Sequence, residues 1–261
     1  MQTVVVKIGG SLAVDETKLT DFISAVAKVP RQDFQVVVVH GGGKDINENI
    51  ALLQEKPHFI EGLRVTTPGI MKMVEMTLSG HVNKKIVRML LEQGVRAVGI
   101  SGVDGQLLVA TQMQGKTDLG QVGSIQKVNT GLVTDLLKMG WTPVVSPVAF
   151  GVNCAFNINA DTAASELATA MQADQFLLIS DVPGVLDGAK QVIPVLGKVK
   201  IEHLISEGVI SGGMIPKVRA SLDSISRGLR SIHIVGWKDA THFMQQITGE
   251  ANHGTIIRQI D

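Results

Sequence analysis

The sequence is poor in cysteine and in aromatic residues. Cys154 is the single cysteine of 261 residues, so the chain cannot form an internal disulfide, and no run of Cys and His has the spacing of a metal site. Aromatic residues make up 3% of the chain, and tyrosine is absent. The core must therefore be packed mainly with aliphatic side chains, and we expect Cys154 to be a small buried residue among them.

The sequence also lacks an excess of charge and long apolar runs. Lys plus Arg and Asp plus Glu number 24 each, so no global positive field would attract nucleic acid or an anionic membrane. No apolar run approaches the roughly 18 residues that a membrane-spanning helix needs. The first residues lead directly into a β-like run without a signal peptide. These features predict a cytoplasmic protein with no nucleic-acid or membrane partner.

Several common catalytic signatures are missing. The nearest approach to the P-loop pattern G-x-x-x-x-G-K-[ST] has Ala110 in place of the first glycine, ahead of Gly115, Lys116 and Thr117. The sequence contains no G-x-G-x-x-G fingerprint, no H-x-E or C-x-x-C pattern and no G-x-S-x-G elbow. These absences argue against a P-loop ATPase, a dinucleotide-binding Rossmann site, a zinc site and a serine hydrolase.

Short β-branched runs alternate with segments of helical apolar periodicity. Several of the runs are apolar on both faces, which is typical of strands covered by helices on both sides. Alternating strands and helices predict an α/β fold, a three-layer sandwich with a mainly parallel central sheet. The expected strands are 4–8, 36–40, 97–100, 143–148, 176–179 and 232–235, the expected helices include 19–26, 82–90, 164–171 and 218–225, and 105–129 should form a β-hairpin. We expect two lobes, 1–165 and 166–261.

Four glycine-containing turns follow expected strands or precede an expected helix, at 7–11, 40–44, 180–185 and 211–217. Glycines let backbone N–H groups approach an anion closely, and a following helix directs its positive end there. Lysines in three of these turns would add full charges. Each turn alone could still be an ordinary tight turn, whereas three successive glycines after His40 are hard to explain without a ligand or a close neighbouring segment. His40 itself is expected to be structural.

A fifth motif, Asn157-Ile158-Asn159-Ala160-Asp161, stands at the expected start of a helix. Asn157 and Asn159 alternate along an extended segment and should face the same side of the chain. Asp161 could contribute to a site or could simply cap the helix.

Taken in order along the chain, these motifs resemble the amino-acid kinase family. The resemblance extends from Lys7 to the terminal stretch 254–257. The members that phosphorylate N-acetyl-L-glutamate match most closely, on the motifs at 7–10, 40–43, 62–66, 119–123, 157–161, 180–184 and 212–217. The resemblance implies the amino-acid kinase fold. The N-terminal lobe would bind the acylated amino acid and form the dimer, and the C-terminal lobe would bind ATP.

The resemblance implies a transferase that moves the γ-phosphoryl group of ATP onto the side-chain carboxylate of N-acetyl-L-glutamate, in arginine biosynthesis. Lys7 and Lys217 would neutralise the transferring group, and Asp161 would hold both lysines through charge-assisted hydrogen bonds. Magnesium would bridge the ATP phosphates and be held by phosphate and water, so no protein ligand to the metal is expected.

The same resemblance implies how the two substrates are bound. Gly42 and Gly43 would bind the reactive carboxylate, Arg64 would clamp the α-carboxylate, and Asn157 would reach the α-carboxylate or the acetamido group. The expected ATP-binding residues are Gly9, Gly10, Asp181, Val182, Pro183, Gly184, Val185, Leu186, Val209, Ile210 and Ser211.

The resemblance also bears on oligomeric state and on alternatives. Arginine-inhibited hexameric members carry an N-terminal helix for which this sequence has no room, so a homodimer without strong arginine feedback is expected. The helix near 68–93 would pair two subunits, unless its apolar side chains fill the monomer core. N-acetyl-2-aminoadipate kinase remains an alternative, because its substrate is longer by a single methylene. A non-catalytic amino-acid sensor on the same fold is the alternative from another class.

Overall fold

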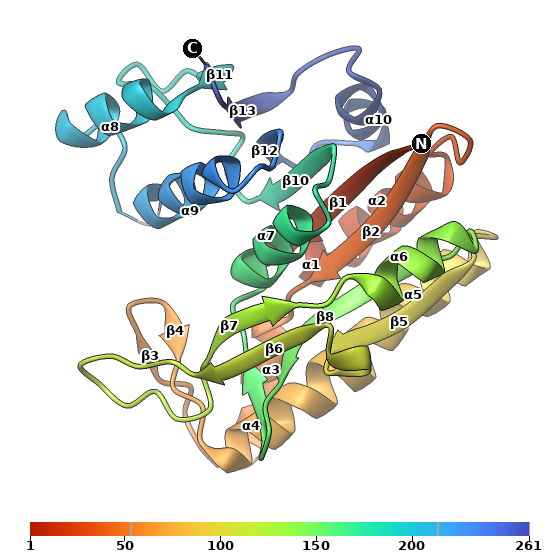
Figure 1. Cartoon of the computed structure of the whole chain (residues 1–261), viewed down its shortest axis with the longest axis vertical. Helices are drawn as coiled ribbons and strands as arrows, with labels where there is room; N and C mark the ends of the chain where they lie inside the picture. Colours follow the sequence, from red (N-terminus) through yellow and green to blue (C-terminus); the bar gives the residue numbers. More distant parts are fainter. Residues whose placement is uncertain (53, 213, 261) are drawn as a thin grey trace.

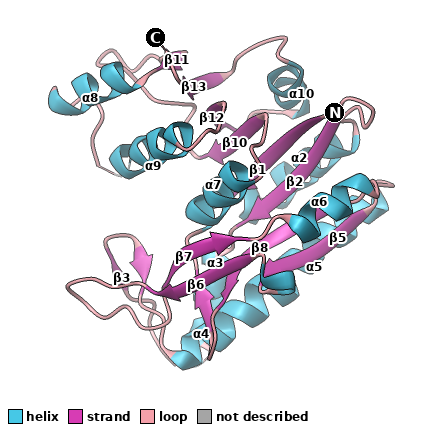
Figure 2. Ribbon diagram, viewed as in Figure 1, coloured by secondary structure: helices cyan, strands magenta, loops and turns pink. Residues whose placement is uncertain are grey.

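The computed structural model describes residues 1–52, 54–212 and 214–260. Within these residues, eleven strands form one sheet and two further strands form a small separate hairpin. Helices cover both faces of the large sheet (Figure 1), and the view coloured by secondary structure makes the strand layer between them easy to follow (Figure 2). The predicted three-layer α/β sandwich is confirmed.

The strands are β1 (Gln2–Ile8), β2 (Phe34–His40), β3 (Phe59–Ile60), β4 (Leu63–Arg64), β5 (Ala97–Gly102), β6 (Leu108–Gln112), β7 (Gly123–Val128), β8 (Thr142–Phe150), β9 (Ala155–Asn157), β10 (Gln175–Ser180), β11 (Val195–Leu196), β12 (Ser231–Gly236) and β13 (Gly254–Arg258). The helices are α1 (Gly10–Val14), α2 (Glu16–Ala27), α3 (Gly43–Ala51), α4 (Pro68–Glu75), the π-helix η1 (Met76–Val82), α5 (Asn83–Glu92), the 3₁₀-helix η2 (Asp104–Gln106), α6 (Gly131–Lys138), α7 (Ala160–Ala170), α8 (Lys198–Ser206), α9 (Met214–Ser226) and α10 (Ala240–Thr248). The six expected strands and four expected helices all form, and the expected hairpin is β6–β7.

Alternation along the central strands divides the core between the two faces of the sheet. In β1, Val5 packs into one apolar cluster while Val4 and Val6 pack into the other. Side chains of α6, α7, α8 and α9 complete the first cluster, and side chains of α1, α2, α5 and α10 complete the second. Because both faces are covered, the central strands read as continuous apolar runs in the sequence.

The central strands run in the order β12-β10-β1-β2-β8, and these neighbours pair in parallel. The carboxyl ends of β1 and β2 lie side by side: Ile8 is opposite His40, and the Gly41 N–H donates to the Ile8 carbonyl at 3.0 Å. Parallel pairing therefore brings the turns that begin at Gly9 and Gly41 to one edge of the sheet, where open α/β sheets bind ligands.

Two expectations about single segments have clear outcomes. Cys154 is exposed, not buried as predicted. It lies in the turn that joins the antiparallel strands β8 and β9, so its side chain has no core to enter. The expected helix near 68–93 is the succession of α4, η1 and α5, and many of its apolar side chains, such as Val74 and Ile86, are buried in this chain's own core. No helix of the described residues is long and apolar enough to cross a membrane.

Candidate active site

Two lysines and one aspartate from distant parts of the chain meet at the carboxyl edge of the sheet. The Lys7 Nζ lies 2.6 Å from Asp161 Oδ1, and the Lys217 Nζ donates to Asp161 Oδ2 at 2.7 Å. The three side chains come from β1, α7 and α9. The structure thus brings together the three residues that the sequence suggested for catalysis, with each carboxylate oxygen holding one ammonium group.

Local structure explains why the three side chains can meet. A Cβ at Gly9 would overlap the Lys7 ammonium group, so any other residue at this position would displace that group from its place beside Asp161. Asn159, not Asp161, caps α7: its Oδ1 accepts from the N–H groups of Asp161 at 2.9 Å and Thr162 at 3.3 Å. The capping role considered for Asp161 is therefore filled by Asn159, and both Asp161 oxygens remain available to the lysines.

The charges in this group do not cancel. Burial of the Asp161 carboxyl acts to raise its pKa, but the positive charges of Lys7 and then Lys217 outweigh it, so the pKa lies below its ordinary value. The carboxylate is therefore ionised at neutral pH. Two ammonium groups and one carboxylate leave one net positive charge, in a place where Lys7 is largely removed from solvent. This net positive charge would favour the binding of an anionic ligand.

A second polar group is centred on Arg64 in β4. The residue is 7% exposed, and its guanidinium lies 4.7 Å from the centroid of the Phe59 ring and donates from Nη2 to the Gly43 carbonyl at 3.2 Å. The Nη1 atom is buried and has no hydrogen-bond partner among the described residues. Buried donors are rarely left unpaired in folded proteins. An unpaired guanidinium N–H beside the glycine turn therefore points to an anionic ligand.

Asn157 is joined to Arg64 through Thr66. The Asn157 Nδ2 donates to Thr66 Oγ1 at 3.1 Å, and that hydroxyl donates to the Arg64 carbonyl at 2.7 Å. Thr66 is fully buried, and a Cβ at Gly120 would overlap its carbonyl oxygen. Sequence reasoning noted the stretch 62–66 as a motif but missed Thr66 as the residue that joins β4 to β9. The signal in the sequence was the hydroxyl of Thr66, two residues after Arg64, which can hydrogen-bond the nearby backbone.

The glycine turn after β2 lies between these two groups. A Cβ on Gly41 would stand 3.6 Å from the Ala160 Cβ at the start of α7, and a Cβ on Gly42 would stand 2.7 Å from Leu78 Cδ2. The turn therefore packs against the helix that carries Asp161, and Gly42 leaves no room for a side chain. Gly43 begins α3 and has open space where a Cβ would be. The two polar groups thus flank one glycine turn.

His40, the last residue of β2, holds this turn through a hydrogen bond and has a structural role, as expected. It is fully buried, and burial lowers its pKa to about 4. Its Nδ1 donates to the Gly41 carbonyl at 2.9 Å, and its Nε2 accepts from the Asn83 Nδ2 at 3.2 Å. These partners assign the neutral tautomer with the proton on Nδ1.

The segments suggested for ATP binding lie in two loops of the C-terminal half. Residues 181–186 follow β10, and residues 209–211 precede α9. Val185 and Ile210 are buried in the same apolar cluster, so their side chains serve packing and only their backbones could meet a nucleotide. Asp181 and Pro183 line a cavity of about 470 Å³. Gly213 of the fourth glycine turn lies outside the described residues.

No group of three or more His, Cys, Asp or Glu side chains that could hold a metal ion occurs among the residues the structure describes. Both Asp161 oxygens are engaged by lysines. The donor set at this edge of the sheet therefore fits a cation held through the phosphates of a nucleotide better than one held by carboxylates.

The fold and this lysine–aspartate–lysine site define a class of protein. The chain belongs to the amino acid kinase family, whose sequence profile matches residues 2–236. Among its relatives, the acetylglutamate kinase of Geobacillus kaustophilus is 44% identical over 260 residues, which cover 99% of this chain and 97% of that protein. The acetylglutamate kinase of Cereibacter sphaeroides is 41% identical over 260 residues, covering 99% of this chain and 88% of that protein.

A solved structure supports the same assignment of fold. The protein smu.665 from Streptococcus mutans UA159 superposes with a TM-score of 0.76 at 26% sequence identity, and the match covers 98% of both chains.

The electrostatics of the site give a prediction that needs no substrate. In the Lys217→Ala variant the pKa of Asp161 should rise, because one of the two cations that oppose the effect of burial is removed. Carbon-13 NMR of the Asp161 carboxyl across a pH titration measures this. The Lys200→Ala variant, which removes an exposed lysine of α8, serves as the control. An unchanged Asp161 pKa in Lys217→Ala would contradict the proposed charge balance.

Proposed function

We propose that this protein is a kinase that transfers the γ-phosphoryl group of ATP to the side-chain carboxylate of N-acetyl-L-glutamate. The product would be N-acetyl-L-glutamyl 5-phosphate, and the reaction would belong to arginine biosynthesis. The relatives at 41% and 44% identity, both acetylglutamate kinases matched over nearly the whole chain, support this substrate. The single observation that carries the proposal is the pair of lysines on one carboxylate, Asp161.

Phosphoryl transfer between two anions needs positioning and positive charge more than covalent chemistry. Lys7 and Lys217 would neutralise the oxygens of the transferring group from two sides, and backbone N–H groups at Gly9 and Gly10 would add donors. Asp161 would fix both ammonium groups before the substrates arrive. It would not act as a general base, because a carboxylate acceptor is ionised at pH 7 and has no proton to lose.

The acylated amino acid would bind around the glycine turn after β2. The N-terminus of α3 at Gly42 and Gly43 would receive the reactive carboxylate. The α-carboxylate would pair with Arg64, whose buried Nη1 has no partner among the described residues. Asn157, oriented by its hydrogen bond to Thr66, would contact the α-carboxylate or the acetamido group.

The nucleotide would bind to the second of two lobes, which we propose to be 1–165 and 166–261. Its contacts would come from residues 181–186 and 209–211, on the far side of Lys217 from the acylated amino acid. Magnesium would be carried on the phosphates and water, because both Asp161 oxygens already pair with lysines. When bound, the metal would supply positive charge between the β- and γ-phosphates.

Two alternatives differ in what they require of the site. N-acetyl-2-aminoadipate is one methylene longer, and a methylene is worth about 1–3 kcal/mol of discrimination, so the same site could accept it weakly. A non-catalytic amino-acid sensor would have no need for the charged trio. All three residues are present, and Lys7 and Lys217 each form an ion pair with Asp161, which favours an enzyme.

A substrate panel tests the proposed function. ADP release should be fastest with N-acetyl-L-glutamate, slower with N-acetyl-2-aminoadipate, and at background with aspartate, glutamate and UMP. The Lys217→Ala variant should lose about 10²–10³-fold in kcat and so controls for contaminating kinases. Faster turnover of N-acetyl-2-aminoadipate would move the assignment to that substrate, and no turnover of any acceptor would favour the sensor.

Replacing Arg64 with Ala tests the substrate-binding role. The KM for N-acetyl-L-glutamate should rise roughly 10- to 100-fold, since a charge-assisted hydrogen bond to a carboxylate is lost, while the KM for ATP stays within about 2-fold. Steady-state kinetics with each substrate varied in turn measures both constants. Arg258→Ala, at the exposed end of β13, should leave both unchanged. A selective loss of ATP affinity in Arg64→Ala would reverse the assignment of the two lobes.

The enzyme would act in the cytoplasm as a homodimer paired through the succession of α4, η1 and α5. Met76 and Leu91 on these helices are 57% and 50% exposed, although most of their apolar neighbours are buried. Sedimentation should give twice the 27.8 kDa chain mass, and Leu91→Asp should shift the protein toward monomer, whereas Val199→Asp on the exposed face of α8 should not. Wild-type protein that sediments only as a monomer would contradict the dimer.

A further inference from the structure

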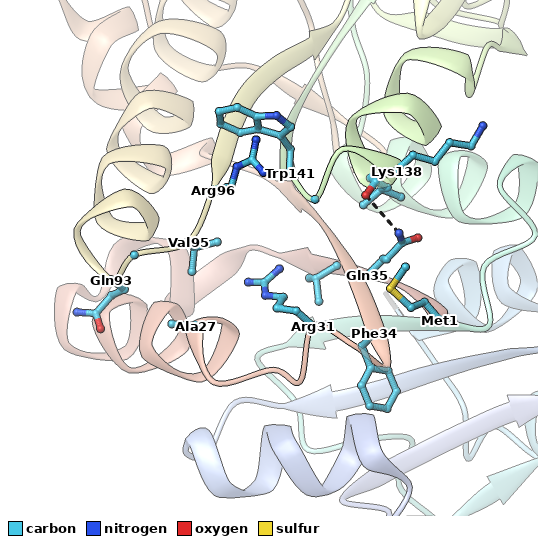
Figure 3. A pocket seen from close by; sticks show the side chains of 14 residues that line it. Met1, Ala27, Arg31, Phe34, Gln35, Gln93, Val95, Arg96, Lys138 and Trp141 are labelled. Atoms are coloured by element: carbon cyan, nitrogen blue, oxygen red, sulfur yellow. Dashed lines mark hydrogen bonds between the residues drawn. The ribbon is translucent and has the colours of Figure 1, made fainter.

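A cavity of about 420 Å³ lies at the opposite end of the sheet from the lysine–aspartate–lysine site. Its walls come from the turn between α2 and β2, the turn between α5 and β5, and the segment that joins α6 to β8 (Figure 3). Phe34 opens β2 in this cavity, whereas His40 closes the same strand below the glycine turn. A seven-residue strand spans roughly 20 Å, so the cavity and the active site are separate places.

Three of the side chains that line this cavity are basic and none is acidic. Arg31, Arg96 and Lys138 belong to the lining, all of which is described. Lys138 has Asp135 at 3.7 Å, but neither arginine has a carboxylate within ion-pair distance among the described residues. Burial lowers the pKa of the Arg31 guanidinium, and no acidic group opposes this effect. The chain has as many acidic as basic residues, so two guanidinium groups in one cavity without a carboxylate partner among the described residues are unusual.

The buried residue Thr142 holds the side chain of Arg31 and the backbone of Arg96. The Arg31 Nη1 donates to Thr142 Oγ1 at 2.7 Å, and the Thr142 N–H donates to the Arg96 carbonyl at 2.7 Å. The Arg31 Nη2 also donates to the Val26 carbonyl at 3.2 Å. The Arg96 guanidinium stacks 4.7 Å from the centroid of the Trp141 ring. In Figure 3 the Arg31 side chain lies in the middle of the lining, and Arg96 lies beside the ring of Trp141.

The remaining donors suit an anion. A guanidinium has five N–H donors, and the contacts of Arg31 use two of them. Its planar fork matches carboxylate and phosphate groups, and a site of a few hundred cubic ångströms is the size that small ligands occupy. The hydrogen bond to Thr142 accounts for Arg31 but not for Arg96, whose side chain stacks on Trp141 and has no hydrogen-bond or ion-pair partner within the described part of the chain.

We propose that this cavity binds a small polyanion, two of whose carboxylate or phosphate groups pair with Arg31 and Arg96. The inference concerns a site apart from the active site and does not depend on which acceptor the kinase uses. The ligand class follows from the two guanidinium groups, and the cavity volume limits it to a small molecule.

Trp141 provides a built-in reporter. The chain has two tryptophans and no tyrosine, so in a Trp237→Phe background Trp141 dominates the emission. Citrate tests carboxylate ligands and inorganic pyrophosphate tests phosphate ligands. At least one should change the emission saturably with a Kd of about 1 mM or tighter. Acetate and sodium chloride at matched ionic strength should not.

Variants of the two arginines decide where the anion binds. Arg31→Gln and Arg96→Gln should each weaken binding by about 10-fold or more, measured by calorimetry because Arg96 contacts the reporter ring. Arg258→Gln and Lys217→Ala should bind as well as the parent. Saturation by neither probe, equal responses to acetate, or unchanged affinity in both arginine variants would overturn the proposal. Binding that is lost in Lys217→Ala instead would place the anion in the active site and overturn it as well.

Discussion

The attraction of two ammonium groups to one carboxylate is the interaction on which the rest of this site depends. As a scale, two like unit charges 4 Å apart repel by about 4 kcal/mol at an effective dielectric constant of 20. Lys7 and Lys217 can therefore stand together before a substrate arrives only because Asp161 lies between them. The carboxylate neutralises one of the two positive charges, and the other remains to attract anions. The site is therefore preorganised before a ligand binds.

The parallel sheet is what allows this interaction to form. Lys7 belongs to β1, which is paired with β2 on one side and β10 on the other, so its backbone is held at the centre of the sheet. The helices α7 and α9 pack on one face of that sheet and deliver Asp161 and Lys217 to the carboxyl end of β1. The glycine turn after β2 packs against the start of α7, so this turn and the charged trio share one support.

The central strands could be predicted from the sequence because β-branched runs are a strong local signal, whereas the turns that carry Lys7, Asp161 and Lys217 were ambiguous one by one and were grouped only through the resemblance of the whole set to a family. Features set by tertiary contact were missed. Cys154 looked like a core residue, but the three-residue strand β9 that places it in an exposed turn is too short to leave a pattern. The assignment of the α7 cap to Asn159 instead of Asp161 depends on backbone geometry, and the arginine-lined cavity depends on turns that only the folded chain brings together.

The two positive regions at opposite ends of the sheet are only weakly coupled by direct electrostatics. Between them β2 is a run of buried valines from Val36 to Val39. Two unit charges roughly 20 Å apart interact by about 1 kcal/mol at an effective dielectric constant of 20, so an anion beside Arg31 would exert only a weak direct field on Lys7. Any larger influence of the cavity on phosphoryl transfer must therefore pass through a displacement of β2 itself. Because both faces of this strand are close-packed, such a displacement would have to move the helices on each side with it.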